Sequence, residues 1–212
     1  MSPKYYIQNY IHIKDQMISL NGKILYRDEA EDFTSFIKNA YKFLDTAYPK
    51  FFKMDNLSKL AFLAADVLLK AEDLLLVSEN ETENQNNIAL VFSNRASSLD
   101  TDRKHQASIE KIDEYFPSPA VFVYTLPNIC LGEISIKFKL HSENSFFIFE
   151  RFNPDHLYEY AAYLLRFGKA EKVLCGWVEF DNNDYEAFLY LVGSEGKIDH
   201  QVEEINRLYH LL

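Results

Sequence analysis

The side chains in this sequence best suited to nucleophilic chemistry are the thiols of Cys130 and Cys175. A nucleophilic cysteine needs a lowered pKa, which usually comes from a helix N-terminus or a basic neighbour. Cys175 lies within an apolar run that is typical of a buried strand. Cys130 lies one turn into a helix expected to begin at Pro127, but aliphatic residues flank it on both sides. We therefore expect both thiols to be structural, with a reactive Cys130 as the alternative.

Two carboxylates are candidates for a shared acid–base site. Glu150 and Glu179 end two successive expected strands, so a common edge of the sheet could bring them together. Solvated strand ends are the simpler interpretation. The six histidines are scattered, and none shows metal-site spacing with a nearby cysteine. The sequence also lacks a phosphate-binding loop and a nucleophile-elbow serine motif, so we expect neither a metal nor a cofactor.

Elements that could position these groups follow from hydrophobic periodicity and turn signals. Strands are expected at 5–13, 88–92, 145–149, 173–180 and 187–192, with an Asn21-Gly22 hairpin turn before 23–26. Helices are expected at 33–44, 57–70, 100–115, 127–140, 154–166 and 199–211. The alternation of helices with short apolar strands indicates a layered α/β domain with a largely parallel sheet. Residues 1–212 show no internal linker, so we expect one domain.

The charge balance narrows the classes of partner. A net charge of −10 argues against nucleic acid and against an anionic membrane surface, because both attract lysine and arginine. No stretch approaches the ~20 apolar residues that a membrane span needs. The first residues lack an apolar signal segment, and two cysteines make no disulfide framework. We expect a cytoplasmic protein with reduced thiols.

Three stretches in fixed order carry a family resemblance. The first is 48–60, and the second is 118–136, where Asn128 and Gly132 form an Asn-x-x-x-Gly pattern. The third is 161–179, where Gly176 and Glu179 match a Gly-Gly-Ala-Glu-like motif from which Trp177 departs. Aligned without gaps, these stretches resemble the amino-terminal half of the β-ketoacyl synthases (ketosynthases), the condensing enzymes of fatty-acid and polyketide synthesis.

The resemblance fixes which residue occupies the nucleophile position. In ketosynthases a cysteine lies on the sharp turn before the helix that here ends at Gly168. Counting forward from Asn128 or back from Gly168 reaches Arg151, next to Glu150. Arginine is always protonated and cannot attack a thioester. The two ketosynthase histidines come from a carboxy-terminal half that this sequence does not contain, so the resemblance implies no condensation by this chain alone.

The resemblance also implies a fold and an interface. The fold would be a single thiolase-like half with a mixed, mostly parallel five-stranded sheet and helices on both faces. Helix 154–166 is apolar nearly all round, so either a second half-fold or the final helix should cover it. Ketosynthases dimerise through the segment that matches 128–149. Candidate interface residues are Phe146, Phe147, Phe149, Leu157, Tyr158 and Tyr163, with core packing as the alternative for the phenylalanines.

The function implied is that of a chain-length-factor-like subunit, similar to the short partners in aryl-polyene-type pathways. Such a subunit would form a homo- or hetero-dimer, pair with a full-length ketosynthase and serve an acyl carrier protein. An acidic carrier could meet a basic patch of Lys50, Lys53 and Lys59, although these side chains could equally form a solvated face. The alternatives are an acyl-thioester enzyme that uses Cys130 or Glu150, and a homodimeric scaffold without a pathway partner.

Overall fold

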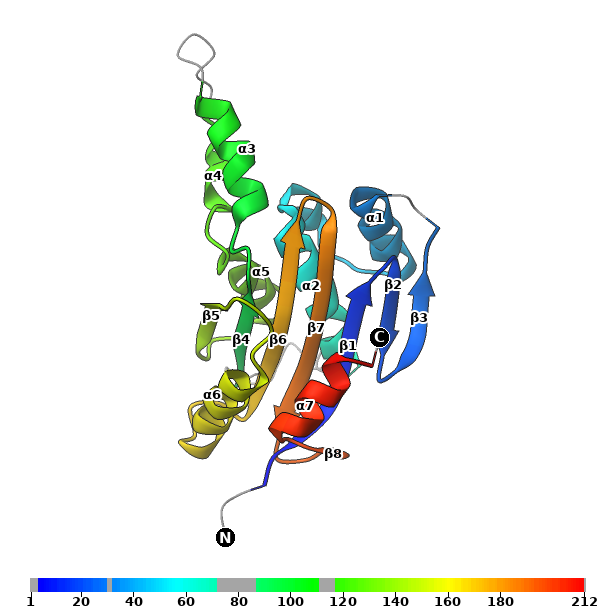
Figure 1. Ribbon diagram of the computed structural model, residues 1–212, viewed down its shortest axis with the longest axis vertical. Coiled ribbons are helices and arrows are strands. Elements are labelled where there is room, and N and C mark those ends of the chain that lie inside the picture. The colour runs from blue at the N-terminus through cyan, green and yellow to red at the C-terminus, as the bar shows by residue number, and fades with distance from the viewer. Residues whose placement is uncertain (1–3, 30–31, 72–86, 111–116, 212) are drawn as a thin grey trace, which may run out of the picture.

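The computed structural model describes residues 4–29, 32–71, 87–110 and 117–211. One sheet runs through this part of the chain, and helices pack on both of its faces (Figure 1). Its strands are β1 (Tyr6–Lys14), β2 (Met17–Leu20), β3 (Lys23–Arg27), β4 (Ile88–Asn94), β5 (Asn144–Ile148), β6 (Lys172–Asp181), β7 (Asp184–Gly193) and β8 (Ile198–Asp199). The helices are α1 (Phe33–Phe43), η1 (Pro49–Lys53), α2 (Asn56–Lys70), α3 (Leu99–Ile109), α4 (Pro119–Val123), α5 (Ile129–Phe138), α6 (Pro154–Arg166) and α7 (Val202–Tyr209).

The sheet has the order β3-β2-β1-β7-β6-β4-β5, with β8 beside β1. Strand β4 pairs in parallel with β5 and β6, and the remaining pairs are antiparallel. Because β7 runs antiparallel to both β6 and β1, the central strands β5, β4, β6 and β1 all share one direction. The expected mixed sheet is therefore confirmed, with four of the five strands β1, β7, β6, β4 and β5 running in one direction. The expected total of five strands is wrong, because β2, β3 and β8 extend the sheet to eight.

Three two-residue turns set the register of the hairpins. Both central residues have positive φ in Asp15-Gln16 (49° and 55°), Asn21-Gly22 (52° and 77°) and Asn182-Asn183 (50° and 68°). Such turns match the right-handed twist of the strands that they join. The predicted turn at Asn21-Gly22 is confirmed. Asp15-Gln16 carries no glycine or asparagine signal, which is why β2 was not expected from the sequence.

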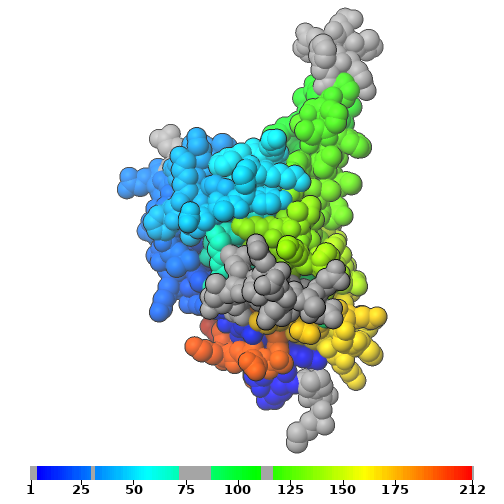
Figure 2. Space-filling view, turned by 180° about the vertical axis from the view of Figure 1, so that it is seen from behind, coloured from blue at the N-terminus to red at the C-terminus, as the bar shows by residue number. Residues whose placement is uncertain are grey.

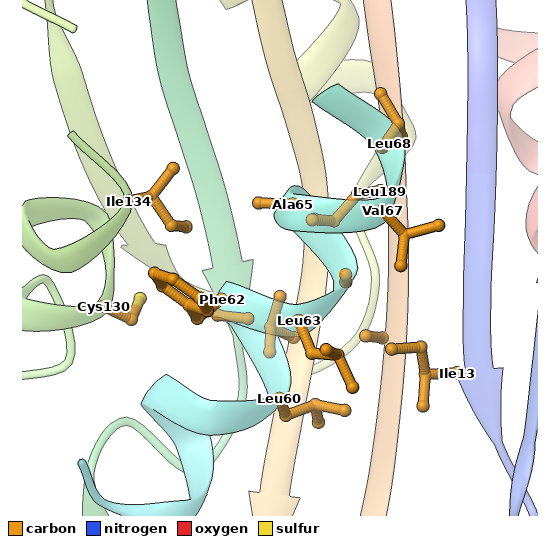
Figure 3. Packing of buried hydrophobic residues seen from close by; sticks show 14 of the residues in the cluster. Ile13, Leu60, Phe62, Leu63, Ala65, Val67, Leu68, Cys130, Ile134 and Leu189 are labelled. Carbon is orange, nitrogen blue, oxygen red and sulfur yellow. The ribbon is translucent and has the colours of Figure 1, made fainter. Parts of the chain in front are cut away.

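The first face of the sheet is covered by α1, α2 and α5 around one large apolar cluster. Helix α2 begins where the Asp55 side chain accepts a hydrogen bond from the Ser58 amide at 2.9 Å. It is buried along most of its length because it packs on strands β1, β6 and β7 of the sheet and has α5 beside it (Figure 3). From α2, Phe62 points toward Cys130 and Ile134 on α5 (Figure 3). Their mutual burial fixes α5 against α2.

The second face is covered by α6 and α7. Apolar residues of both helices share one buried cluster with the sheet: Leu157, Ala161, Leu164, Ile205 and Leu208. The alternative in which the final helix folds over this face is therefore confirmed. The expectation that α6 is buried all round is wrong, because Tyr163 is 49% exposed and faces away from the cluster. Helix α6 ends as predicted at Gly168, whose φ of +63° suits glycine.

Helices α3 and α4 lie side by side and form an arm that projects beyond the body of the molecule (Figures 1 and 2). The apolar run 120–124 falls in α4, which the Ser118 side chain caps at the amide of Val121. Phe122 on this helix is 60% exposed. Helix α5 begins at Ile129 rather than at Pro127. Residues 111–115 of the expected helix 100–115 lie outside the described residues.

Candidate functional site

A cleft of about 620 Å³ lies at the turn between β5 and α6, where the sequence places Glu150 and Arg151. One wall is the turn itself, and the other is the C-terminal part of α7. The residues that line it are Phe149, Glu150, Arg151, Phe152, Asn153, Pro154, Asp155, Asn206, Tyr209 and His210. The expected nucleophile position therefore lies in an accessible cleft.

Anchors on both sides of the turn hold Glu150 and Arg151 in place. Before them, the Phe149 amide donates to the Asn94 carbonyl at 2.9 Å and continues the β4–β5 ladder. After them, Phe152 is buried, and the Asn153 side chain caps α6 by accepting from the His156 amide at 3.1 Å. The backbone is therefore fixed, while the two charged side chains extend from it.

Glu150 and Arg151 are both exposed to solvent. Neither makes a hydrogen bond or ion pair with another described residue. A guanidinium without a protein partner can bind a carboxylate or phosphate, but it has no lone pair for attack on a thioester. The arrangement favours recognition of an anionic group over covalent catalysis at this turn.

Helix α7 adds polar groups that sequence reasoning missed, namely Asn206 and His210. The cleft thus combines a carboxylate, a guanidinium and an imidazole. His210 lies almost sixty residues beyond Arg151 in the sequence, and no motif links them. The periodicity of the final helix predicts an apolar face but does not indicate which surface that face will cover.

Both cysteines lie away from this cleft, at positions that disfavour thiol chemistry. Cys130 and Cys175 are each 0% exposed. Burial raises the pKa of both thiols, because a thiolate loses its solvation in an apolar interior. Cys130 packs beside Phe62 in the core (Figure 3). The geometry agrees with the structural role that the sequence predicted for both.

Glu179 has a structural role, which neither the acid–base interpretation nor the solvated strand end anticipated. It is buried, and its side-chain oxygens accept from the backbone amides of Arg95 at 2.6 Å and Ala96 at 3.2 Å. It therefore holds the loop after β4. The interpretation of Glu179 as a solvated strand end is wrong, because its side chain is buried. Glu179 is also not among the residues that line the cleft containing Glu150.

The remaining motif residues shape the backbone or the surface. A Cβ on Gly176 would lie 2.0 Å from the Phe188 carbonyl oxygen, so only glycine fits between β6 and β7. Asn128 occupies the N-cap position of α5 without a side-chain cap bond. Gly132 lies on the outward face of α5, where nothing approaches within 4 Å of an added Cβ. Ile136 on the same helix is 63% exposed.

The candidate interface residues divide into surface and core. Strand β5 ends the sheet and pairs only with β4 among the described strands. On and beside it, Phe146, Phe147 and Phe149 are partly buried. Leu157 is fully buried in the core, so it cannot contact a partner directly. The ring of Tyr158 packs against the ring of His200, with centroids 5.0 Å apart, while Tyr163 is half exposed.

The three lysines of the expected basic patch do not share one surface role. Lys50 pairs at 2.8 Å with the buried carboxylate of Glu133. Glu133 also accepts hydrogen bonds from Tyr124 at 2.9 Å and Tyr48 at 3.1 Å, so this pair belongs to a structural network. Lys53 and Lys59 line a separate cavity at the start of α2.

Within the described ranges, no group of three or more histidine, cysteine, aspartate or glutamate residues is placed to hold a metal ion. None of the helices in that part of the chain combines the length and apolar character needed to cross a bilayer.

Comparison with known proteins gives a match at the level of structure. No family model matches the sequence, and no curated protein matches it. Among solved structures, the ishigamide ketosynthase/chain length factor matches 90% of this chain at 16% identity with a TM-score of 0.62. The complex of the ketosynthase ApeO with its chain length factor ApeC from Xenorhabdus doucetiae matches 97% of it at 15% identity with a TM-score of 0.58. The AntDE:AntF complex, a type II polyketide synthase acyl-carrier protein with its ketosynthase bound to the hexaketide, matches 89% at 14% identity with a TM-score of 0.61.

The matched lengths differ between these structures. The chain spans 62% of the matched chain in the ishigamide and AntDE structures, but 90% of the matched chain in the ApeO–ApeC complex. At such low sequence identity, the likeness concerns the fold. This chain therefore has the α/β fold shared by ketosynthases and chain length factors, as its resemblance to the ketosynthases predicted.

Proposed function

We propose that this chain is a non-catalytic, chain-length-factor-like subunit that pairs with a ketosynthase in carrier-dependent acyl-chain elongation. The observation that carries the proposal is Arg151, which lies in an open cleft at the position that the resemblance assigns to the nucleophile. Both thiols of the chain are buried elsewhere, so no cysteine replaces it. A subunit of this kind would contribute shape and binding surface rather than a covalent step.

The structural neighbours support this class of partner. Two of them contain a ketosynthase together with a chain length factor, and a third contains a ketosynthase with its acyl-carrier protein. The matched chain in the ApeO–ApeC complex is close to this chain in length. A protein of this size therefore has a precedent in a ketosynthase complex.

The surface proposed for pairing is the edge of the sheet at β5 together with the outward side of α5. An edge strand leaves one row of backbone N–H and C=O groups unpaired, which favours the addition of another chain. Ile148 on β5 is 50% exposed and Ile136 on α5 is 63% exposed. Helix α5 and strand β5 contact each other. Apolar side chains on contiguous elements are typical of a protein interface.

The test is co-expression with a full-length ketosynthase from the same organism, followed by size-exclusion chromatography. We expect the two proteins to co-elute, and we expect Ile148→Lys to separate them. The matched control is Phe43→Lys on α1, where the native side chain is 62% exposed but lies far along the sheet from β5. Elution of this chain as a stable homodimer in the presence of the ketosynthase would instead favour the scaffold alternative.

A second candidate is an acyl-thioester enzyme that uses Glu150. The observation that favours it is the presence of His210 in the same cleft, because a carboxylate and an imidazole can share acid–base work. Hydrolysis of an acyl-carrier thioester by the purified chain, lost in Glu150→Gln, would support this candidate over the non-catalytic subunit. The version that uses Cys130 is disfavoured by complete burial of its thiol.

A further inference from the structure

A second, smaller cavity lies where the α3–α4 arm joins the body of the molecule. It has a volume of about 240 Å³. Lysines reach it from three separate elements: Lys53 from η1, Lys59 from α2 and Lys104 from α3. The apolar part of its wall consists of Met54, Val121 and Tyr124. Because Ala120 and Val121 of α4 also line the cavity, a bound molecule would contact the arm and the body together.

The positive charge in this cavity is only partly balanced. Lys53 and Lys59 make no hydrogen bond or ion pair with another described residue, whereas Lys104 pairs with Asp100 at 2.6 Å. Asp55 also lines the cavity, but its carboxylate already accepts from the Ser58 amide at 2.9 Å and the Thr101 hydroxyl at 2.8 Å. Three lysines and one aspartate therefore line the cavity, so its lining carries a net positive charge in a chain whose net charge is −10.

The position of Lys59 adds a reason for an anion. Its side chain is half-buried, and this burial lowers the pKa of its ammonium group, an effect that Lys104 reinforces and Asp55 opposes. Because the pKa of Lys59 stays lowered despite Asp55, that carboxylate offsets only part of the cost of desolvating the ammonium group, and an anion in the cavity would offset more of it. The cavity also includes Asn56, the first residue of α2, where helix amides carry partial positive charge.

We propose that this cavity binds the phosphate group of a small phosphate monoester whose uncharged part rests on the apolar wall. Lysine ammonium groups bind phosphate well as point charges, and a dianion balances two of them better than a carboxylate does. The first-turn amides of α2 would add hydrogen bonds to phosphate oxygens. The site is separate from the Arg151 cleft and does not depend on the function proposed above.

The test is titration of the ¹⁵N-labelled full chain with phenyl phosphate, inorganic phosphate and benzoate, followed by amide chemical shifts. We expect saturable shifts at Asn56, Lys59 and Thr101, with phenyl phosphate binding most tightly and benzoate most weakly. Lys59→Gln should weaken phenyl phosphate binding by about tenfold, the loss expected for one charged hydrogen bond. Lys53→Gln provides a second, more exposed variant in case Lys59→Gln alters the packing of α2.

The matched control is Lys38→Gln, which removes the same charge from the exposed side of α1, outside the cavity. It should change the affinity by less than about twofold if binding is local, because distant surface charges are screened by salt. Equal losses for Lys38→Gln and both cavity variants would overturn the proposal in favour of general charge attraction. Equal binding of benzoate and phenyl phosphate would overturn the assignment of a phosphate group.

Discussion

The ring of Tyr209 on α7 stacks on the ring of Phe152, with centroids 4.2 Å apart and planes inclined by 29°. Phe152 follows Arg151 directly, so this contact joins the last helix to the turn that forms the candidate site. Phe152 also packs edge-on against Trp177 and Phe188 of the sheet. One buried ring therefore connects the turn, the sheet and the helix that builds the second wall of the cleft.

Phe152→Ala should destabilise the protein by about 3 kcal/mol, because it removes a buried aromatic ring and leaves a cavity. The measurement is the free energy of unfolding in urea. Phe122→Ala is the matched control, since that ring is 60% exposed on the arm, and it should cost less than about 1 kcal/mol. Equal effects of the two changes would contradict the anchoring role of Phe152.

Stability should fall as the pH falls from about 6.5 to about 4, the interval between the unfolded and folded pKa values of two buried histidines. Desolvation lowers the pKa of His12 to about 4, opposed by the nearby carbonyls of Tyr209 and Leu208 and by Glu186. Desolvation alone lowers the pKa of His200 to about 4. In this interval the unfolded chain protonates both histidines more readily than the folded chain does. Each histidine therefore lowers the free energy of unfolding by up to about 3 kcal/mol when the pH reaches 4.

Urea unfolding at pH 7.5 and pH 5 measures this effect. His12→Gln and His200→Gln should each make stability less dependent on pH. His141→Gln is the control, because His141 is exposed, and it should leave the dependence unchanged. A pH dependence that persists in the double variant His12→Gln/His200→Gln would assign the effect to other groups.

Native thiols should resist alkylation. Cys130 and Cys175 are both 0% exposed, and burial raises their pKa, so iodoacetamide should add nothing to the folded chain and two groups to the chain unfolded in urea. Arg151→Cys should gain one rapid adduct, because position 151 is exposed at the N-terminal end of α6. Intact-mass spectrometry counts the adducts. Labelling of Cys130 in the folded native chain would contradict the structural role assigned to it.

Glu179→Gln should lower the free energy of unfolding by about 1–3 kcal/mol, the cost of a buried polar group that loses a partner. The carboxylate accepts from two backbone amides, whereas glutamine presents an N–H₂ donor to one of them. Glu150→Gln removes the same charge from an exposed side chain and should stay within about 0.5 kcal/mol of the native chain. An equally small effect for Glu179→Gln would show that the loop after β4 does not need this anchor.

Local structure followed closely from local sequence. The Asp55 and Asn153 caps, the end of α6 at Gly168 and the hairpin at Asn21-Gly22 each depend on interactions within a few residues. The α/β class followed from the alternation of helical and strand periodicities, which reflects which side of each element is buried. The Asp15-Gln16 turn was missed because glutamine follows the aspartate, where hairpin turns of this kind favour glycine.

The residue at the centre of the candidate site could also be predicted from the sequence, because the family resemblance alone assigns Arg151 to the nucleophile position. Its surroundings were decided only by tertiary packing. Helix α7 brings His210 into the same cleft, and the β4 loop converts Glu179 from an expected surface acid into a buried anchor. Tertiary packing also buries Cys130 against α2, which disfavours reaction of its thiol. Periodicity reports which side of a helix is apolar, but the surface that this side covers depends on contacts between distant segments, and those contacts form only when the whole chain packs.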